Sequence, residues 1–446
     1  AVVNPPSPQA SMTAKIATVG PHRRLGEARR LAHRWKGRVF FAFLDQGAYS
    51  LANFVLTILY ASWLPLDTFG RYVVVWTASL FIETIQVALI VASLPAIVSR
   101  HGRHNRRRLD TAAFWVVVGY SLATSVVLVA AALIISPWRP AYLWALLAVA
   151  LANPFQRLYL LFRRLAYIHD RQRIAAAMAA CYGVVSVVGA FILVRADALS
   201  LASTISLWGI GALAGIGAAV ALGVKRPRTM RSATIAWLAI EIWRTGRWLS
   251  GAAVANWISN WAIFPLIAVT TGAGAAGIIR ALQNLLTPIV QFNAALHLAV
   301  LPRVADKVAS DGDHYGLRFA RRGTAIFTAI AASYCAVILA AAHLILPALY
   351  RKPEIAAAAY LLWPLALAIV LDAVRQASAI SLLARRRTRI VFTARWIALA
   401  VFAGGALLLS ALIGFAGILW ATAAASAAGA GIVLASALSD NRTETH

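Results

Sequence analysis

The sequence predicts an all-α polytopic membrane protein with about 12 transmembrane helices, arranged as two parallel six-helix repeats around a central cavity. The composition, the spacing of the apolar segments and the placement of the basic residues lead to this prediction. Hydrophobic residues make up 61% of the chain, which also carries a formal charge of +27. A helix needs about 20 mostly apolar residues to cross a bilayer. Stretches of that length lie near 39–63, 71–99, 111–135, 141–162, 174–194, 199–224, 247–269, 277–302, 324–346, 355–384, 390–412 and 415–438.

The basic residues orient these spans. If the spans alternate in direction, most of the 42 Lys and Arg residues fall on one side, in 1–38, 100–110, 163–173, 225–247, 303–322, 385–389 and the short tail. The other side has only Arg71, Arg139, Arg195, Arg351 and Lys352. Loops rich in Lys and Arg stay cytoplasmic, so we predict an integral inner (plasma) membrane protein with both termini in the cytoplasm. The high net positive charge is then explained by the membrane topology. We expect the basic residues to contact membrane lipids rather than nucleic acid.

A long basic segment divides the chain into halves. We predict a disordered basic cytoplasmic arm (1–36), an N-terminal bundle (37–224), a cytoplasmic connector with an amphipathic surface helix (225–246), a C-terminal bundle (247–438) and a cytoplasmic tail (439–446).

An internal repeat supports this division. QVALIVASLP (86–95) lies over NAALHLAVLP (293–302), and the same offset pairs Gly70 with Gly277 and Asn53 with Asn260. Two repeats with an even number of spans each have the same orientation in the membrane and enclose a cavity between them.

Polar residues recur at three- and four-residue steps within four of the spans, so each set lies on one face of a helix. We predict that these faces line the cavity, because a polar stripe facing lipid is costly. The alternative is hydrogen bonding that only joins helices. The candidates for substrate binding are Gln46, Tyr49, Ser50, Asn53, Asn256, Asn260, Arg280, Asn284, Thr287, Gln291 and Arg375.

Three acidic residues within the spans are candidates for ion coupling. Glu83 lies deepest, and an unpaired carboxylate there either protonates or holds a cation, a proton or sodium ion, because burial disfavours its charge. Its alternative is a salt bridge, for example to Arg280. Asp45 lies nearer the cytoplasmic face. Asp372 either pairs with Arg375 one turn away or lies on the substrate path.

The sequence gives little indication of a functional role for the other basic residues within the spans. Arg157 and Arg395 lie close to the predicted cytoplasmic ends of their spans, so we expect them to extend toward the interface. His297 has no evident partner, and we expect a hydrogen-bonded interior residue.

The stretch DQGAYSLANFVLTILYASWLPLDTFGRYVVVW (45–76) resembles the opening of polysaccharide flippases of the multidrug/oligosaccharidyl-lipid/polysaccharide exporter superfamily. The matching residues are Ser50, Asn53, Phe54, Ala61, Pro65, Asp67, Phe69, Gly70 and Tyr72. LILPALYRKPEIAAAAYLLWPLALAIVLDAV (344–374) resembles the family's passage between the ninth and tenth spans, although Arg351 and Lys352 replace an acid-rich connector.

This resemblance implies a flippase that moves a polyprenyl-diphosphate-linked oligosaccharide from the cytoplasmic to the outer leaflet by alternating access, for surface or exopolysaccharide biosynthesis. It also implies that the first, second, seventh and eighth spans line the cavity. Contact with a polysaccharide polymerase or export machinery is a further expectation.

Two transporter classes remain as alternatives. A major-facilitator transporter also has twelve spans, but SRHGRHNRRRLD (99–110) lacks the Asp-Arg-x-Gly-Arg order of that class. A multidrug exporter of the same superfamily would need more acidic partners for cationic drugs. We expect no enzyme, since no nucleophile has a base at a suitable spacing. No metal or cofactor motif occurs.

Overall fold

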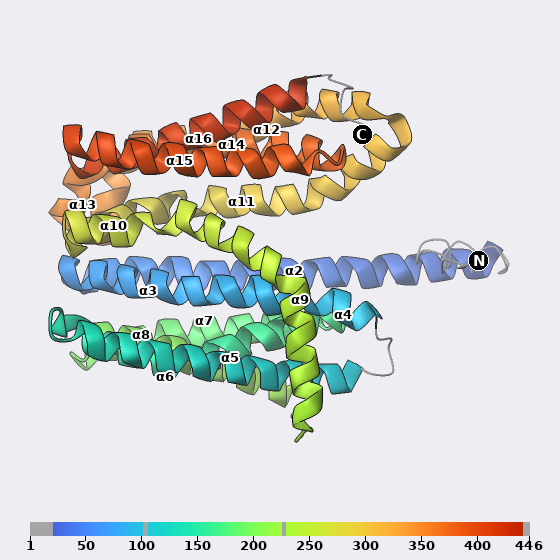
Figure 1. The fold of residues 1–446 in the computed structure, drawn as a ribbon, viewed down its shortest axis with the longest axis horizontal. Helices are drawn as coiled ribbons and strands as arrows, with labels where there is room; N and C mark the ends of the chain where they lie inside the picture. The colour runs from blue at the N-terminus through green and yellow to red at the C-terminus, as the bar shows by residue number, and fades with distance from the viewer. Residues whose placement is uncertain (1–20, 101–105, 225–228, 440–446) are drawn as a thin grey trace.

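The computed structural model describes residues 21–100, 106–224 and 229–439, and every regular element in these ranges is helical (Figure 1). The N-terminal half has α2 (Pro21–Trp63), α3 (Leu66–Gln86), the π-helix η1 (Val87–Val91), α4 (Leu94–Arg100), α5 (Arg106–Ile135), the 3-10 turn η3 (Pro140–Tyr142), α6 (Leu143–Ile168), α7 (Gln172–Arg195) and α8 (Leu201–Ala221). The C-terminal half has α9 (Ser232–Trp261), α10 (Ile263–Thr270), α11 (Ala273–Asp311), α12 (Asp313–Tyr350), α13 (Pro353–Ala357), the 3-10 turn η4 (Ala358–Leu361), α14 (Leu362–Ala384), α15 (Thr388–Ile413) and α16 (Phe415–Leu438).

Within the described residues, ten helices are long and apolar enough to cross a membrane, and α9 with α10 forms an eleventh candidate that is bent by 46°. The remaining predicted span, α2, is not among them. Its polar residues, including Asp45, Gln46 and Asn53, lower its mean hydropathy. The prediction of an all-α polytopic membrane protein is confirmed.

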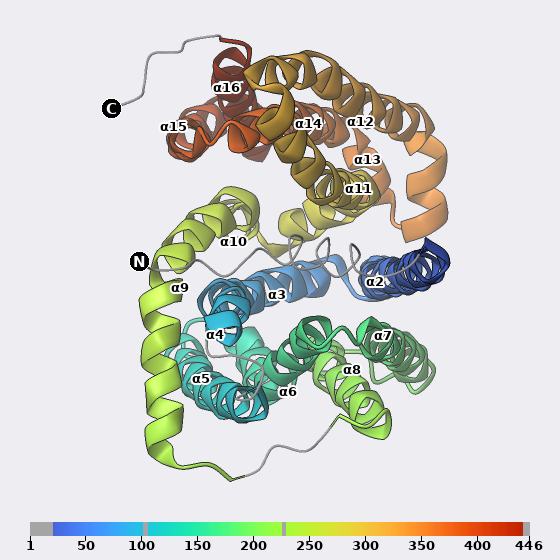
Figure 2. The same ribbon diagram turned by 90° about the vertical axis from the view of Figure 1, so that its right-hand side faces the viewer.

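The helices form two bundles (Figure 2). One contains α2 to α8, the other contains α10 to α16, and α9 runs across the first bundle to reach the second. Figure 1 shows that α2 begins and α16 ends at the same end of the molecule. The side of the membrane on which this end lies stays a prediction.

Two segments differ from the sequence prediction. The predicted disordered arm is helical from Pro21 onward, because good helix formers such as Leu, Ala and Arg occur there, while residues 1–20 lie outside the described part. The amphipathic segment of the connector is not a separate surface helix. It continues without a break into the seventh span as α9, which packs against η1, α3 and α5.

The bundles share an apolar core at one end only, judged from the described residues. This core joins residues such as Tyr60 and Val73 of the first bundle to Ile279 and Leu346 of the second. It lies where α2 and α12 end and where α3 and α11 begin, and we call this the α3/α11 end. Toward the opposite end, the remaining apolar clusters each belong to a single bundle or to that bundle with α9.

Two glycines of the internal repeat meet at the α3/α11 end. A Cβ atom added to Gly70 would lie 1.7 Å from the carbonyl oxygen of Ala273, and one added to Gly277 would lie 3.1 Å from the backbone nitrogen of Gly70. The backbone N–H of Gly274 also donates to the Asp67 carboxylate at 3.1 Å. The two helices therefore approach so closely because neither has a side chain at the crossing.

Polar contacts across the bundles reinforce this closure. The hydroxyl of Ser62 donates to the backbone oxygen of Leu349 at 2.9 Å, and the Lys352 ammonium donates to the backbone oxygen of Leu64. Burial lowers the pKa of Lys352 below its ordinary value, and Glu354 offsets part of this effect. The α3/α11 end is thus sealed by apolar packing, backbone contact and hydrogen bonds.

Candidate functional site

A cavity of about 610 Å³, lined by both apolar and polar side chains, lies between the two bundles. Its wall is made by residues of α2, α3, α6, α9, α11, α14, α15 and α16, with single residues from α7, α8 and α10. All but one of the candidate residues from the sequence line it: Gln46, Tyr49, Ser50, Asn53, Glu83, Asn256, Asn260, Arg280, Asn284, Thr287, Gln291, Asp372 and Arg375. That these residues bind a substrate or an ion stays a prediction.

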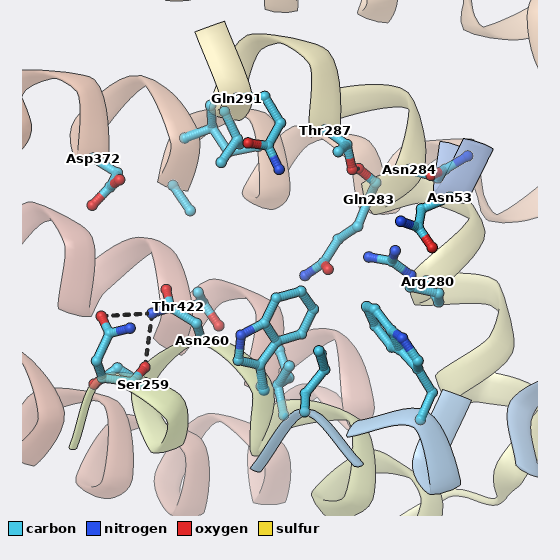
Figure 3. Close-up of a pocket in the computed structure, with 18 of the residues that line it drawn as sticks. Asn53, Ser259, Asn260, Arg280, Gln283, Asn284, Thr287, Gln291, Asp372 and Thr422 are labelled. Atoms are coloured by element: carbon cyan, nitrogen blue, oxygen red, sulfur yellow. Dashed lines mark hydrogen bonds between the residues drawn. The ribbon is translucent and has the colours of Figure 1, made fainter. Parts of the chain in front are cut away.

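Most polar residues of the stripes do not join helices to one another. Asn53 donates to the backbone of Tyr49, Thr287 to that of Gln283, and Asn260 to that of Asn256, each within its own helix. Two of them do join helices: the Asn284 amide donates to the backbone oxygen of Phe54 in α2 at 3.2 Å, and Oδ1 of Asn256 accepts from Arg395 of α15. In Figure 3 the side chains drawn from α11 point into the space between the bundles. The stripes therefore leave polar atoms available to a ligand.

Arg280 lies in an aromatic clamp. Its guanidinium carbon is 4.3 Å from the ring centre of Trp76 and 5.9 Å from that of Trp261, and the two rings meet edge to face at 5.1 Å. The residue is only 8% exposed. No carboxylate of the described residues lies within 4.0 Å of its nitrogens. Arg280 is therefore a buried cation with no counter-ion among the described residues, facing the cavity beside Asn53 and Gln283 (Figure 3).

A proline places one half of this clamp. Pro265 has no N–H to donate to the backbone oxygen of Trp261, so the helix breaks at Ala262 and bends by 46° into α10. Trp261 is the last residue of α9, directly before the bend, and its ring reaches Trp76 of α3 there. Neither tryptophan was predicted as a site residue, because an aromatic residue in an apolar span gives no signal of its own.

Glu83 also faces the cavity, but its partner is not Arg280. The nearest cation is Arg157 of α6, with 3.8 Å between Arg157 Nη2 and Glu83 Oε2. Arg157 is 1% exposed, so the expectation that it extends to the membrane interface is wrong. Its side chain faces Glu83 inside the bundle, and its backbone oxygen accepts a hydrogen bond at 2.9 Å from Gln86, which anchors α6 to α3. This buried arginine in the cavity wall was not predicted from the sequence.

Asp45 is the one candidate that does not line the cavity. Arg163 binds its carboxylate through two nitrogens, at 2.8 and 3.1 Å, and the Tyr167 hydroxyl donates to it at 2.7 Å. Asp45 is 1% exposed. It points into the first bundle between α2 and α6, so a coupling ion would have to displace Arg163. The structure gives no support to Asp45 as an ion-coupling residue.

Asp372 and Arg375 pair as the spacing allows, at 2.6 Å, and Gln376 donates to the second carboxylate oxygen at 2.6 Å. Arg395 lines the cavity beside them and donates to the side-chain oxygen of Asn256. Its expected extension to the interface is therefore wrong. The polar wall formed by α9 and α14 gives its guanidinium a partner inside the bundle.

Two further observations limit the chemistry. Nδ1 of His297 lies 3.2 Å from the backbone oxygen of Gln376, as expected for an interior residue. Across the described residues, no group of three or more His, Cys, Asp or Glu side chains could hold a metal ion. The charged groups of the cavity are thus Arg157, Arg280, Arg375 and Arg395 against Glu83 and Asp372.

No protein-family model and no curated protein sequence matches the chain. Solved structures do. An inward-facing multidrug resistance MATE family transporter of the MOP superfamily has a TM-score of 0.73 at 10% identity, over 89% of this chain and 97% of its own. The lipid II flippase MurJ in an inward closed conformation has a TM-score of 0.69 at 10% identity, over 89% and 87%.

The chain has the fold of the multidrug/oligosaccharidyl-lipid/polysaccharide exporter superfamily. The MATE multidrug transporter DinF-BH matches as well, with a TM-score of 0.61 at 13% identity over 90% of this chain and 94% of its own. The superfamily fold therefore replaces the major-facilitator alternative.

Proposed function

We propose that this protein is a flippase that moves a polyprenyl-diphosphate-linked oligosaccharide from the cytoplasmic to the outer leaflet by alternating access. The observation that carries the proposal is Arg280, a buried guanidinium that faces the cavity with no carboxylate of the described part of the chain beside it. Such a charge is costly unless a ligand supplies the counter-ion. A diphosphate does so, because guanidinium binds phosphate oxygens through two parallel N–H groups.

The rest of the cavity suits the glycan. Amide and hydroxyl side chains, such as Asn53, Asn260, Thr287 and Gln291, match the donors and acceptors of sugar hydroxyls. The polyprenyl tail stays in the lipid, so the cavity needs to enclose only the polar part of the substrate.

The packing of the two bundles supports alternating access. They hold together at the α3/α11 end and have separate cores toward the opposite end. With the orientation that the basic residues favour, the α3/α11 end lies on the outer side. The cavity would then receive its substrate from the cytoplasmic leaflet, and transport would require the α3/α11 contacts to open. MurJ, whose structure resembles this chain, is described as a lipid II flippase.

A multidrug exporter is the second candidate, and the aromatic clamp of Trp76 and Trp261 favours it, because such rings bind flat cations. Two observations weigh against it. An arginine already occupies that clamp, and each carboxylate of the cavity, Glu83 and Asp372, has an arginine within 4.0 Å.

The test is to deplete the protein from its native cell and measure lipid-linked intermediates in membrane extracts by mass spectrometry. We expect a complete polyprenyl-diphosphate oligosaccharide to accumulate and surface polymer to be lost. Re-expression of the wild-type chain should reverse both effects, and re-expression of Arg280→Gln should reverse neither. Unchanged lipid intermediates, or full rescue by Arg280→Gln, would reject the proposal.

A further inference from the structure

Glu83 and Arg157 face each other across a gap in the cavity wall. The shortest distance between the charged groups is 3.8 Å, beyond hydrogen-bonding range. Among the described residues, Nε and Nη1 of Arg157 have no hydrogen-bond partner although the side chain is 1% exposed. The Glu83 side chain is 27% exposed, so its carboxylate is open to the cavity.

This pair is looser than the Arg163 and Asp45 pair, which is in direct contact at 2.8 Å. The Glu83 carboxylate stays open to the cavity, whereas Nε and Nη1 of Arg157 are buried among the described residues without a partner, and an unsatisfied buried donor is costly. A group that accepts from the guanidinium and donates to the carboxylate at once would satisfy both residues.

The charges select the chemistry of that group. Glu83 repels an anion and Arg157 repels a cation, so the occupant is neutral. A sugar ring supplies neighbouring hydroxyls, each of which both donates and accepts. Tyr182 and Trp208 line the cavity as well, and Gln156, next to Arg157 in the chain, donates to the backbone oxygen of Trp208 at 2.7 Å. Aromatic rings in the same cavity wall present a surface for the apolar face of a sugar.

Glu83 and Arg280 lie at different depths along their helices. Glu83 lies 17 residues after the start of α3, whereas Arg280 lies 7 residues after the start of α11 at the same end of the molecule. With a rise of 1.5 Å per residue, these positions are about 25 Å and about 10 Å along their helices. A ligand held at Arg280 through its diphosphate would therefore reach Glu83 and Arg157 only with its glycan.

We propose that Glu83 and Arg157 form a subsite for neutral sugar hydroxyls, in which hydroxyls of one ring of the lipid-linked glycan bridge the carboxylate and the guanidinium. This inference rests on the proposed function and assigns Glu83 to substrate recognition in place of ion coupling. In this arrangement Arg280 binds the diphosphate, and Glu83 with Arg157 binds the sugar.

The test compares two probes on the purified protein in nanodiscs: polyprenyl diphosphate, and the same lipid carrying a neutral disaccharide. For the wild type we expect the glycosylated lipid to bind at least about tenfold more tightly, because hydrogen bonds to charged groups are stronger than neutral ones. The double variant Glu83→Gln/Arg157→Gln removes both charges and keeps the net charge. It should lose that advantage while binding polyprenyl diphosphate within about twofold of the wild type.

Asp110→Asn is the matched control. Asp110 belongs to the same bundle, is 25% exposed and pairs with His169 at 2.8 Å outside the cavity. It should leave both affinities unchanged. If the double variant does not fold, the single Glu83→Gln variant should show a smaller loss of the sugar advantage.

The outcomes separate the two proposals. If neither probe binds the wild type, the proposed flippase function is wrong. If both probes bind the wild type equally, the flippase proposal stands and the sugar subsite is wrong, as expected for a gap filled only by water. The subsite is also overturned if Glu83→Gln alters the proton or sodium dependence of transport but not the affinity ratio.

Discussion

Two arginines in the protein interior, Arg163 and Arg280, have similar aromatic surroundings, but only Arg163 is paired with a carboxylate among the described residues. Arg163 lies 4.6 Å from the ring centre of Tyr49 and 5.6 Å from that of Tyr159, much as Arg280 lies over Trp76 and Trp261. Arg163 also has Asp45, which binds it through two oxygens away from the cavity. Arg280 has no such partner and faces the cavity.

The presence or absence of a carboxylate partner distinguishes an arginine with a structural role from one that can bind an anionic ligand. The protein neutralises Arg163 when it folds, so removal of Asp45 would leave a bare buried charge. The counter-ion of Arg280 has to come from outside the described chain. An aromatic clamp therefore does not by itself mark a binding site, whereas a clamp without a carboxylate does.

The largest expected effect is on the stability of the paired site. Asp45→Ala leaves the Arg163 guanidinium buried without a counter-ion, which lowers the free energy of unfolding by about 3–5 kcal/mol. Thermal unfolding in detergent, followed by tryptophan fluorescence, measures this. A loss below about 1 kcal/mol would mean that Asp45 and Arg163 do not depend on each other.

At the unpaired site we expect loss of function without loss of stability. Arg280→Gln removes the charge that binds the diphosphate and should weaken binding of polyprenyl diphosphate by at least about thirtyfold, or about 2 kcal/mol. Its melting temperature should equal or exceed that of the wild type, because an uncompensated buried charge is gone. Arg280→Lys should recover part of the affinity, since lysine keeps the charge but loses the paired N–H groups. A destabilised Arg280→Gln would show that Arg280 has a structural partner after all.

A third variant sharpens the comparison by changing which side of the membrane the cavity faces. Gly70→Ala places a methyl group against Ala273, which disfavours the closed α3/α11 end by about 1–3 kcal/mol. The readout is a cysteine at Ser79, in the cavity wall, in a chain whose native Cys181 and Cys335 have been replaced. Its labelling by an impermeant maleimide from the α3/α11 side should rise roughly fivefold or more.

Gly119→Ala is the control for this variant, because a Cβ atom at Gly119 has nothing within 4 Å. Equal labelling in Gly70→Ala and Gly119→Ala would show that the glycine crossing does not hold the α3/α11 end closed.

The smallest effect concerns the clamp itself. Trp261→Leu keeps an apolar side chain but removes one of the rings next to Arg280, so the guanidinium is less well held. We expect polyprenyl diphosphate to bind about 2- to 30-fold more weakly, corresponding to about 0.5–2 kcal/mol for a cation–π contact. The matched substitution Tyr182→Leu, at a cavity-lining ring that packs against Tyr49 and Tyr159, should leave this affinity unchanged. Equal losses in both variants would mean that cavity shape, and not the clamp, sets the affinity.

The sequence was informative wherever a single helix decides the outcome. Asn53, Thr287 and Gln291 were placed on the cavity wall because residues three or four apart share a helical face. The same pattern could not tell a face toward the cavity from one toward the bundle interior, so it did not show that Asp45 lies away from the cavity. Its position depends on Arg163 of another helix.

Features that arise between helices were not predictable from one sequence. Arg157 and Arg395 were expected at the interface because they lie near helix ends, but their side chains face Glu83 and Asn256 of other helices. The continuity of α9 was missed as well, since its charged residues resemble those of a separate surface helix. The meeting of Gly70 and Gly277, by contrast, links two glycines that the internal repeat had already paired.

The central claim is that the substrate supplies the counter-ion of Arg280. The most direct measurement is transbilayer movement of a polyprenyl-diphosphate oligosaccharide in proteoliposomes, followed by protection of the glycan from an added glycosidase. We predict that the wild type moves this lipid, that polyprenyl diphosphate competes with it, and that stably folded Arg280→Gln does not move it. Movement by Arg280→Gln at the wild-type rate would contradict the account, and so would a wild-type protein that moves a cationic dye but not this lipid.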